Sequence, residues 1–289
     1  MNKKKILILG SGGQLGNYLF KNLKKIKKYQ IVSSQSLNVR LINIKKDIRK
    51  ILKIKPNCII NCSGYTNVPM AEKNKKKAID LNCNKLLYLA KFCKKYKIKI
   101  IHFSTDYVFP GKNKLYNISD MTKPINFYGY TKLRGEKLLK KSGCKYLIFR
   151  ISWLISGHKS SFLMKIKNRI TEHKNVNVIN DAFSSITSVK LIYTFFKINL
   201  DQLVDYKIIG LYHLRNNNIV SYFTVAKFIE SLLGRKYKNS VKKIKFRNYK
   251  STVKIPKFSK LNIIKTKRTF IIPGNKWRDD IKFIHENKN

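Results

Sequence analysis

One stretch near the N-terminus decides the fold: Ile6-Leu7-Ile8-Leu9-Gly10-Ser11-Gly12-Gly13-Gln14-Leu15-Gly16. Its four leading apolar residues predict a buried strand, and an amphipathic helix-length stretch follows the last glycine. Gly10 permits a tight turn, Gly13 lets a pyrophosphate approach the backbone, and Gly16 lets the helix pack close to the sheet. The first N–H groups of that helix favour an anion. A plain tight turn would also use glycine, but the position between strand and helix favours a dinucleotide site.

Outward from this turn, strand-like apolar runs alternate with amphipathic stretches through the first 150 residues. We expect strands at 5–9, 29–33, 58–62, 98–103 and 146–151, and helices at 14–27, 45–54, 73–96 and 126–142. Such alternation is typical of right-handed βαβ units, and it predicts an α/β fold with a doubly wound, Rossmann-like parallel sheet. Further on the alternation loosens, with helical stretches at 160–172, 187–199 and 221–233.

The change in pattern after Trp153 also predicts the domain organisation. We expect residues 1–150 to form a dinucleotide-binding domain to which 175–215 also belong. Residues 151–174 and 216–289 are expected to form a smaller α/β substrate-binding lobe. No low-complexity linker separates the two parts, so the lobe should pack against the first domain.

The charge of the chain allows two interpretations. With 63 Lys and Arg against 14 Asp and Glu, the 289 residues carry a formal net charge of +49. Such a charge would suit a nucleic acid or another acidic partner. However, ten of the 63 basic residues are Arg and so 53 are Lys, spread from end to end. Specific nucleic-acid sites favour Arg gathered on one face, so we expect a compositional bias and no specific nucleic-acid partner.

Apolar runs and cysteines bear on the compartment. No apolar run approaches the roughly 20 residues of a membrane span, and the first apolar run, 6–9, is shorter than the core of a secretory signal. The five cysteines form no Cys-x-x-Cys pair and have no histidine at ligand spacing. We therefore expect a cytoplasmic protein with free thiols, no metal site and no membrane contact.

The second strand suggests which dinucleotide is bound. An acidic residue about 20 positions after the glycine turn would hold an adenosine ribose 2′-hydroxyl. Here the chain reads Val32-Ser33-Ser34-Gln35, followed by Asn38 and Arg40. Hydroxyls with a nearby cation tolerate a 2′-phosphate better than a carboxylate would. We therefore expect NADPH, with NADH as the alternative.

Two segments carry candidate catalytic residues. A predicted strand ends in Ser104-Thr105-Asp106, and a predicted helix opens with Tyr128-Gly-Tyr-Thr-Lys132. Tyr128 and Lys132 share one helix face, and a lysine cation beside a phenol lowers the phenol pKa from about 10 toward that of a working proton donor. Tyr193 and Lys197 have the same spacing without the strand-end context, which indicates packing.

At this point the chain resembles a known family, the dTDP-4-dehydrorhamnose reductases among the extended short-chain dehydrogenases/reductases. The matching residues cover nearly the whole chain, densely to about 190. They include the glycine turn, Gly64-Tyr65-Thr66, His102-Phe-Ser-Thr-Asp-Tyr-Val-Phe-Pro-Gly111, Tyr128-Gly-Tyr-Thr-Lys132, Arg150-Ile-Ser-Trp153, Gly210-Leu-Tyr-His213 and Trp277. The resemblance implies reduction of the C4 ketone of a nucleotide-linked 6-deoxy-4-keto sugar, most simply dTDP-4-dehydro-L-rhamnose, for surface polysaccharide.

The resemblance also implies roles for individual residues. Tyr128 would protonate the C4 oxygen, Thr105 would hydrogen-bond it, and Lys132 would hold the nicotinamide ribose. The sugar nucleotide would contact Thr105, Asp106, Tyr128 and Trp153. The cofactor would contact Gly10, Gly13, Gln14, Leu15, Gly16, Asn43, Ile44, Gly64, Tyr65, Thr66, Phe103, Tyr128 and Lys132. A homodimer is a further expectation.

Departures from the family pattern keep alternatives open. Dehydratases of this fold resemble each other in an Asp-Glu pair after the threonine, whereas here Asp106 precedes Tyr107, which favours a reductase. Val68-Pro69, the 181–187 segment and Ile255-Pro256 differ from the family on the substrate side. A reductase or epimerase of another sugar nucleotide is therefore one alternative. A non-catalytic dinucleotide-binding relative that regulates a partner enzyme is another, although such a protein needs no tuned phenol.

Overall fold

A six-stranded parallel sheet forms the centre of the computed structural model, which describes residues 3–287. Its strand order is β11-β6-β4-β3-β1-β2. The strands are β1 (Lys5–Leu9), β2 (Gln30–Ser33), β3 (Cys58–Asn61), β4 (Lys99–Thr105), β6 (Tyr146–Ile151) and β11 (Gly210–Leu214). The first five agree with the expected strands to within two residues, and the predicted α/β fold with a doubly wound parallel sheet is confirmed. The edge strand β11 lies in the region where the alternation is too loose to indicate it.

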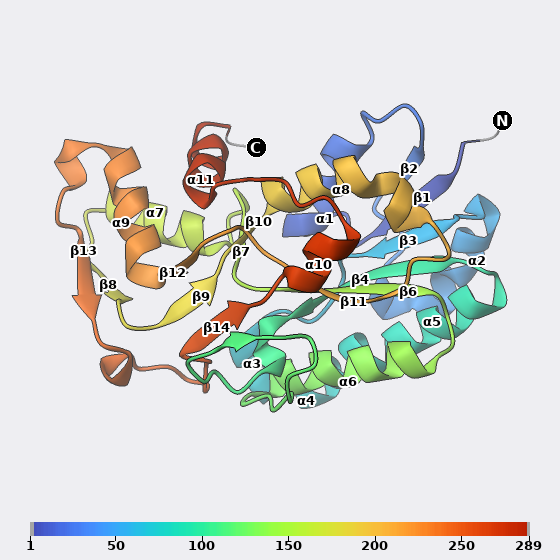
Figure 1. Ribbon diagram of the computed structural model, residues 1–289, viewed down its shortest axis with the longest axis horizontal. Helices are drawn as coiled ribbons and strands as arrows, with labels where there is room; N and C mark the ends of the chain where they lie inside the picture. The colour runs from blue at the N-terminus through green and yellow to red at the C-terminus, as the bar shows by residue number, and fades with distance from the viewer. Residues whose placement is uncertain (1–2, 288–289) are drawn as a thin grey trace.

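Helices cover both faces of this sheet (Figure 1). α1 (Gln14–Leu23) and α8 (Val189–Val204) pack together on one face, and α2 (Ile44–Ile54), α5 (Lys85–Lys95) and α6 (Phe127–Lys141) cover the other. Alternate residues of β1 enter the two cores: Ile6 and Ile8 lie on the α1 and α8 side, and Leu7 on the opposite side. A strand that is buried on both faces requires such a continuous apolar run. For this reason the sequence of β1 predicts a strand so clearly.

The predicted helix at 73–96 is divided in the structure. α3 (Val68–Lys73) and α4 (Lys75–Ile79) come first, a π-helical turn occupies Asp80–Asn84, and α5 follows. The Asn82 side chain donates to Tyr65 O at 3.1 Å and to Thr131 Oγ1 at 2.9 Å. A π turn reorients a side chain within a helix, and here it aims the Asn82 amide at the loop after β3 and at α6. Apolar periodicity does not report such a turn.

A smaller lobe lies beside the carboxyl ends of the large sheet (Figure 1). It contains α7 (Phe162–Thr171), α9 (Tyr222–Leu233) and a parallel strand pair, β8 (Val176–Ile179) with β13 (Val241–Ile244). Its four-stranded sheet has the order β12-β9-β14-β5, formed by β12 (Ile219–Ser221), β9 (Phe183–Ser185), β14 (Phe258–Leu261) and β5 (Leu115–Tyr116). A short parallel pair, β7 (Leu154–Ile155) with β10 (Thr187–Ser188), connects it to the large sheet, and α10 (Ile264–Thr269) and α11 (Trp277–Glu286) end the chain.

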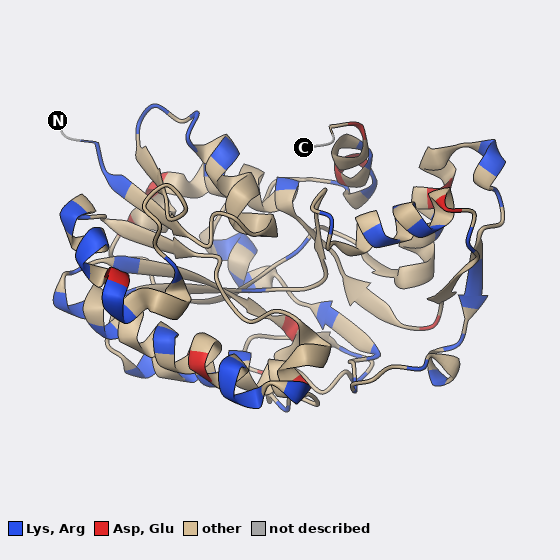
Figure 2. Cartoon of the chain, turned by 180° about the vertical axis from the view of Figure 1, so that it is seen from behind, with Lys and Arg blue, Asp and Glu red and all other residues tan. Residues whose placement is uncertain are grey.

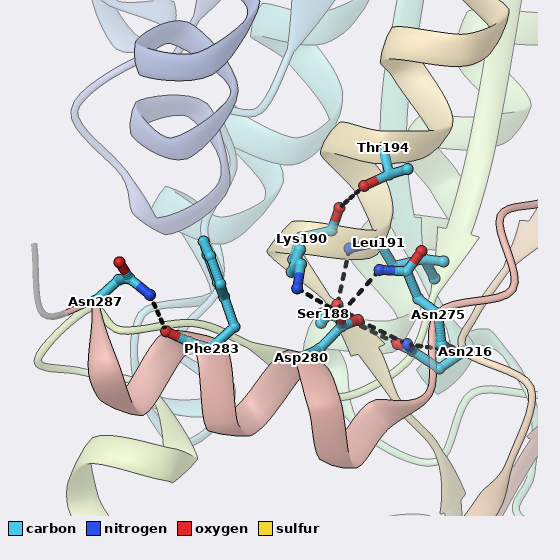
Figure 3. A network of polar contacts seen from close by, with 9 residues as sticks. All are labelled: Ser188, Lys190, Leu191, Thr194, Asn216, Asn275, Asp280, Phe283 and Asn287. Carbon is cyan, nitrogen blue, oxygen red and sulfur yellow. Dashed lines mark hydrogen bonds and ion pairs between the residues drawn. The ribbon is translucent and has the colours of Figure 1, made fainter.

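A buried carboxylate attaches the last helix. Asp280 on α11 is 1% exposed and accepts hydrogen bonds from Asn216 Nδ2 at 2.9 Å, from Asn275 Nδ2 at 2.8 Å and from Ser188 Oγ (Figure 3). The same Ser188 hydroxyl caps α8 by accepting from Leu191 N at 2.8 Å. The C-terminal helix is therefore fixed to the start of α8 through one shared hydroxyl.

In the described part of the chain, the basic residues are spread over the whole fold and the cysteines are unpaired. Lys and Arg lie over both the large-sheet part and the smaller lobe (Figure 2). Between residues 3 and 287 no helix has the length and apolarity that crossing a membrane would require. All five cysteines are free thiols, and within the same range no group of three His, Cys, Asp or Glu side chains is arranged to hold a metal ion.

Candidate active site

The glycine turn is built as its sequence predicts. Gly10 has φ +82°, and a Cβ there would lie 2.6 Å from Ser63 Oγ. A Cβ on Gly16 would lie 2.2 Å from Gly10 O, so only glycine lets α1 pass so close to the turn. Ser34 Oγ accepts from Gly10 N at 3.1 Å and ties the turn to the end of β2.

A cavity of about 930 Å³ opens where the chain leaves the carboxyl ends of β1 and β3. The order of strands reverses here, because β2 lies on one side of β1 and β3 on the other. Open α/β sheets bind ligands at such a switch point. Twelve of the predicted site residues line the cavity: Gly10, Gly13, Gln14, Leu15, Gly64, Thr66, Phe103, Thr105, Asp106, Tyr128, Lys132 and Trp153.

Four predicted cofactor residues do not line the cavity. Gly16 packs against the turn itself, and Tyr65 hydrogen-bonds Asn82 through its backbone. Asn43 ends a 3₁₀ turn and Ile44 is the fully buried first residue of α2, while the preceding Leu41 and Ile42 line the cavity. Leu41 and Ile42, and not Asn43 and Ile44, are therefore placed to contact a cofactor in the cavity.

The end of the cavity beside β2 is polar and contains a cation. Ser11 Oγ and Ser33 Oγ are 2.7 Å apart, and both serines are buried, so these hydroxyls support the turn. Exposed Gln35, Asn38 and Arg40 line the cavity instead. Arg40 is therefore the group available to a phosphate at this end.

Tyr128 is the second residue of α6, and several contacts fix the start of that helix. Asn126 Oδ1 accepts from Gly129 N at 2.8 Å, and Asn126 Nδ2 donates to Lys254 O at 2.9 Å. The Tyr128 side chain is partly buried and lines the cavity. Burial raises the pKa of the Tyr128 phenol to about 12, although a hydrogen bond with Thr105 acts in the opposite direction.

Lys132 lies one turn further along α6 and points at β4. Its Nζ donates to Phe103 O at 2.7 Å and lies 3.1 Å from His102 Nε2. Burial lowers the pKa of Lys132 to about 8. In this structure the expected lowering of the Tyr128 pKa is not seen, because burial of the phenol dominates and Lys132 Nζ contacts Phe103 and His102 instead.

Asp106 follows Thr105 and joins the large sheet to the smaller lobe. Its carboxylate accepts from Thr105 Oγ1 at 3.0 Å, from Ser152 Oγ at 2.6 Å and from Ser259 Oγ on β14. Burial raises the pKa of Asp106. Both carboxylate oxygens thus hold protein hydroxyls, and Asp106 fixes the position of the neighbouring Thr105.

Aromatic side chains form part of the cavity wall. Trp153 lies between Phe162, at 4.9 Å between ring centroids, and Tyr222, at 4.3 Å. Tyr107 meets Tyr128 edge-on at 5.9 Å. Trp153 has φ +38°, an uncommon conformation for a bulky residue that is found where surrounding contacts hold a functional side chain in place.

The glycine turn and the smaller lobe also meet directly. Gln14 Oε1 accepts from Ser156 Oγ at 3.0 Å, and Gln14 Nε2 donates to Ser160 Oγ at 2.9 Å. Ser160 lines the cavity. Sequence reasoning missed Ser160, because nothing in its sequence surroundings indicates the contact; Tyr193, in contrast, packs against Tyr18 as expected.

A buried ion pair supports the floor of the site. Arg150 Nη2 and Nε donate to the two Glu136 oxygens at 2.7 and 2.9 Å, and Ser104 Oγ donates to the same carboxylate at 2.5 Å. Glu136 lies one turn beyond Lys132 on α6. The pair therefore links α6, β4 and β6 directly behind the residues that face the cavity.

Together these residues can protonate a carbonyl oxygen. Tyr128 presents its hydroxyl at one end of the cavity, where a carbonyl oxygen could accept from it, and the Thr105 hydroxyl at the same end donates to Asp106. The other end is the glycine turn, so a dinucleotide held there would extend toward the same point. The arrangement suits proton transfer coupled to dinucleotide chemistry.

Comparisons with known proteins agree with this geometry. The family described as the RmlD substrate binding domain matches residues 4–288. A dTDP-4-dehydrorhamnose reductase of Aggregatibacter actinomycetemcomitans is 31% identical, over 97% of this chain and 98% of its own. The structure of a dTDP-4-dehydrorhamnose reductase of Bacillus anthracis in complex with NADP is similar with a TM-score of 0.88 at 27% identity, over 99% of both chains. A UDP-glucuronic acid 4-epimerase of Bacillus cereus, with a TM-score of 0.82 at 19% identity over 98% of both chains, shares the fold.

Proposed function

Because the chain belongs to the family of the RmlD substrate binding domain, we propose that it is an NADPH-dependent dTDP-4-dehydrorhamnose reductase. It reduces the C4 ketone of dTDP-4-dehydro-L-rhamnose to dTDP-L-rhamnose for surface polysaccharide synthesis. One observation carries the proposal: Thr105, Tyr128 and Lys132 line the same cavity as the glycine turn.

The cavity fits NADPH. Gly10, Gly12 and Gly13 of the turn line the cavity, and the first N–H groups of α1, which favour a pyrophosphate, adjoin them. Among the described lining residues the acidic one is Asp106, at the far end, while Arg40 lies near β2, where a 2′-phosphate would bind. When bound, NADPH supplies the hydride for the carbonyl carbon. We expect NADH to be accepted less well.

The residues of the chain supply the remaining chemistry. Tyr128 gives its proton to the C4 oxygen as that oxygen becomes an alcohol, and Thr105 turns its hydroxyl hydrogen from Asp106 to the same oxygen. Lys132 holds the nicotinamide ribose. Trp153 and Asp106 form the sugar side of the cavity, Asp106 by fixing Thr105.

Oxidation of NADPH tests the proposal. Purified protein is mixed with NADPH and dTDP-4-dehydro-L-rhamnose generated in place, and the loss of NADPH absorbance is followed. We expect turnover, faster than with NADH. NADPH binding without oxidation would contradict this substrate and favour another keto-sugar nucleotide or the regulatory alternative.

The setting of the enzyme belongs to the same proposal. We expect a cytoplasmic homodimer without a specific nucleic-acid partner, and the free thiols support a reducing compartment. Light scattering distinguishes the monomer from the dimer. Binding to nucleic acid that ignores sequence and disappears steeply with salt would be nonspecific.

A further inference from the structure

A continuous chain of hydrogen bonds lies behind Lys132. Ser63 N donates to Asn61 Oδ1 at 3.0 Å, and Asn61 Nδ2 lies 3.1 Å from His102 Nδ1. His102 Nε2 lies 3.1 Å from Lys132 Nζ, which donates to Phe103 O at 2.7 Å. The side chains are well buried, with Asn61 0%, His102 2% and Lys132 4% exposed. Water therefore does not satisfy these groups, and each must find its partner within the chain.

The Ser63 amide fixes which way the Asn61 side chain points. A backbone N–H can only donate, so the atom that faces it must be the carbonyl oxygen Oδ1. The Asn61 amine then faces His102, whose Nδ1 must accept. Turning the amide over would set two donors against each other at Ser63 and leave a buried N–H unpaired, which is costly.

The direction of that bond fixes the proton on His102. A neutral imidazole whose Nδ1 accepts carries its hydrogen on Nε2. A doubly protonated ring would donate from both nitrogens and would oppose the Asn61 amine. Burial also holds the pKa of His102 well below its usual value. The Nε2–H group therefore points at Lys132 Nζ.

An ammonium cannot accept this hydrogen bond, because its nitrogen has no lone pair. An uncharged amine can accept from His102 and still donate to Phe103 O. We propose that Asn61 and His102 are positioning residues that favour the uncharged amine of Lys132 until the dinucleotide binds. The proposal rests on the role assigned to Lys132 in the proposed function.

The groups around Lys132 set the pH range in which the uncharged amine predominates. Burial is the main influence and lowers the Lys132 pKa to about 8, while Glu136 and Cys83 act in the opposite direction, so this range begins at about pH 8. The Glu136 carboxylate is already paired with Arg150. Burial raises the pKa of Cys83 to about 11, so that thiol is uncharged near neutral pH. The phenol of Tyr128, raised to about 12, is uncharged as well.

It follows that Lys132 becomes charged when the cofactor binds. Phosphates and ribose hydroxyls of a bound dinucleotide favour an ammonium at Lys132, which then takes up a proton. A positive charge then lies one helical turn from Tyr128 only when the reductant is present. Before binding, the phenol keeps the proton that reduction requires.

Proton uptake on NADPH binding tests the proposal. Titration calorimetry of the full-length protein at about pH 8.5, in buffers of different ionisation enthalpy, counts protons taken up, and the NADPH phosphates are already ionised there. We expect the unaltered protein to take up roughly 0.5 to 1 proton per site. His102→Gln can turn an amide oxygen toward Lys132, which favours the ammonium. Asn61→Leu removes the group that keeps the His102 proton on Nε2. Both variants should therefore take up less than half as many protons as the unaltered protein. Ile101→Val, on the same strand but the opposite face, should leave the uptake unchanged.

Several outcomes overturn the proposal. NADPH binding by the unaltered protein without proton uptake would do so, and so would equal uptake in a folded His102→Gln or Asn61→Leu protein. If the unaltered protein does not bind NADPH, the proposed function fails instead. The chain is then tested alone by acetylation at about pH 8.5, read by mass spectrometry at Lys132, which we expect to react roughly ten-fold faster than in His102→Gln. Equal rates would overturn the assignment.

Discussion

Glu72 Oε1 accepts a hydrogen bond from Phe127 N at 2.7 Å, and this contact joins α3 to the first turn of α6. Phe127 directly precedes Tyr128. The first N–H groups of a helix have no partner within the helix. A carboxylate at this point accepts a hydrogen bond from one of them and is attracted by the positive end of the helix dipole. Glu72 therefore sets the position of the proposed proton donor without facing the cavity.

Glu72→Ala should lower kcat roughly ten-fold, because small displacements of a catalytic group are costly. The affinity for NADPH should change little, since Glu72 does not line the cavity. Steady-state kinetics and binding titrations measure the two effects. Glu72→Gln retains an acceptor oxygen and should recover most of the rate; failure to recover would assign the effect to lost packing.

Tyr128→Phe should lower turnover by at least roughly 100-fold, because the phenol proton is lost while the ring remains. NADPH binding should be retained, which fluorescence titration can check. Tyr130→Phe is the matched control, since Tyr130 is exposed on the same helix and should be neutral. Normal turnover in Tyr128→Phe would remove the role assigned to this residue.

Arg40→Ala should weaken NADPH roughly ten-fold or more and leave NADH nearly unchanged, because a charge-assisted bond to the 2′-phosphate is lost. The ratio of kcat/KM for the two cofactors measures this. Arg49→Ala, an exposed arginine on α2 outside the cavity lining, should leave the ratio unchanged. Equal loss with both cofactors would place Arg40 away from the 2′-phosphate.

Glu136→Ala should lower the free energy of unfolding by about 3–5 kcal/mol, because it leaves the buried Arg150 charge unpaired. Urea unfolding followed by circular dichroism gives the value. Replacing both residues, Glu136→Leu with Arg150→Met, should recover much of the loss, since no buried charge then remains. Glu286→Ala, at an exposed position, should cost less than about 0.5 kcal/mol.

Stability should fall on mild acidification because of His213. Burial lowers the pKa of His213 to about 3, whereas the unfolded chain binds the same proton near pH 6.5. Between these values the unfolded state alone is protonated, so stability is lost as the pH falls. His213→Gln should reduce the loss between about pH 7 and about pH 5 by about 2 kcal/mol, measured by urea unfolding. His173→Gln, at an exposed histidine, should leave the loss as it is.

Local features were predictable and distant pairings were not. The glycine turn, β4 and the start of α6 each have a sequence signal within a few residues, and so Gly10, Thr105 and Tyr128 were found. The register that sets Asn61 beside His102 depends on how β3 and β4 pair. The contact of Asp106 with Ser259 spans 153 residues. The two-residue strands of the lobe are too short to show any periodicity.

The position of β14 late in the chain determines which parts of the protein can fold first during synthesis. Five of the six large-sheet strands lie before residue 152, and β14, at residues 258–261, is the strand that joins β5 to β9. Chains fold from the N-terminus as they leave the ribosome. The glycine turn and Tyr128 therefore emerge long before β14 can complete the four-stranded sheet of the smaller lobe. A ribosome that stops before residue 258 releases a chain that has most of the large sheet but no strand to join β5 to β9.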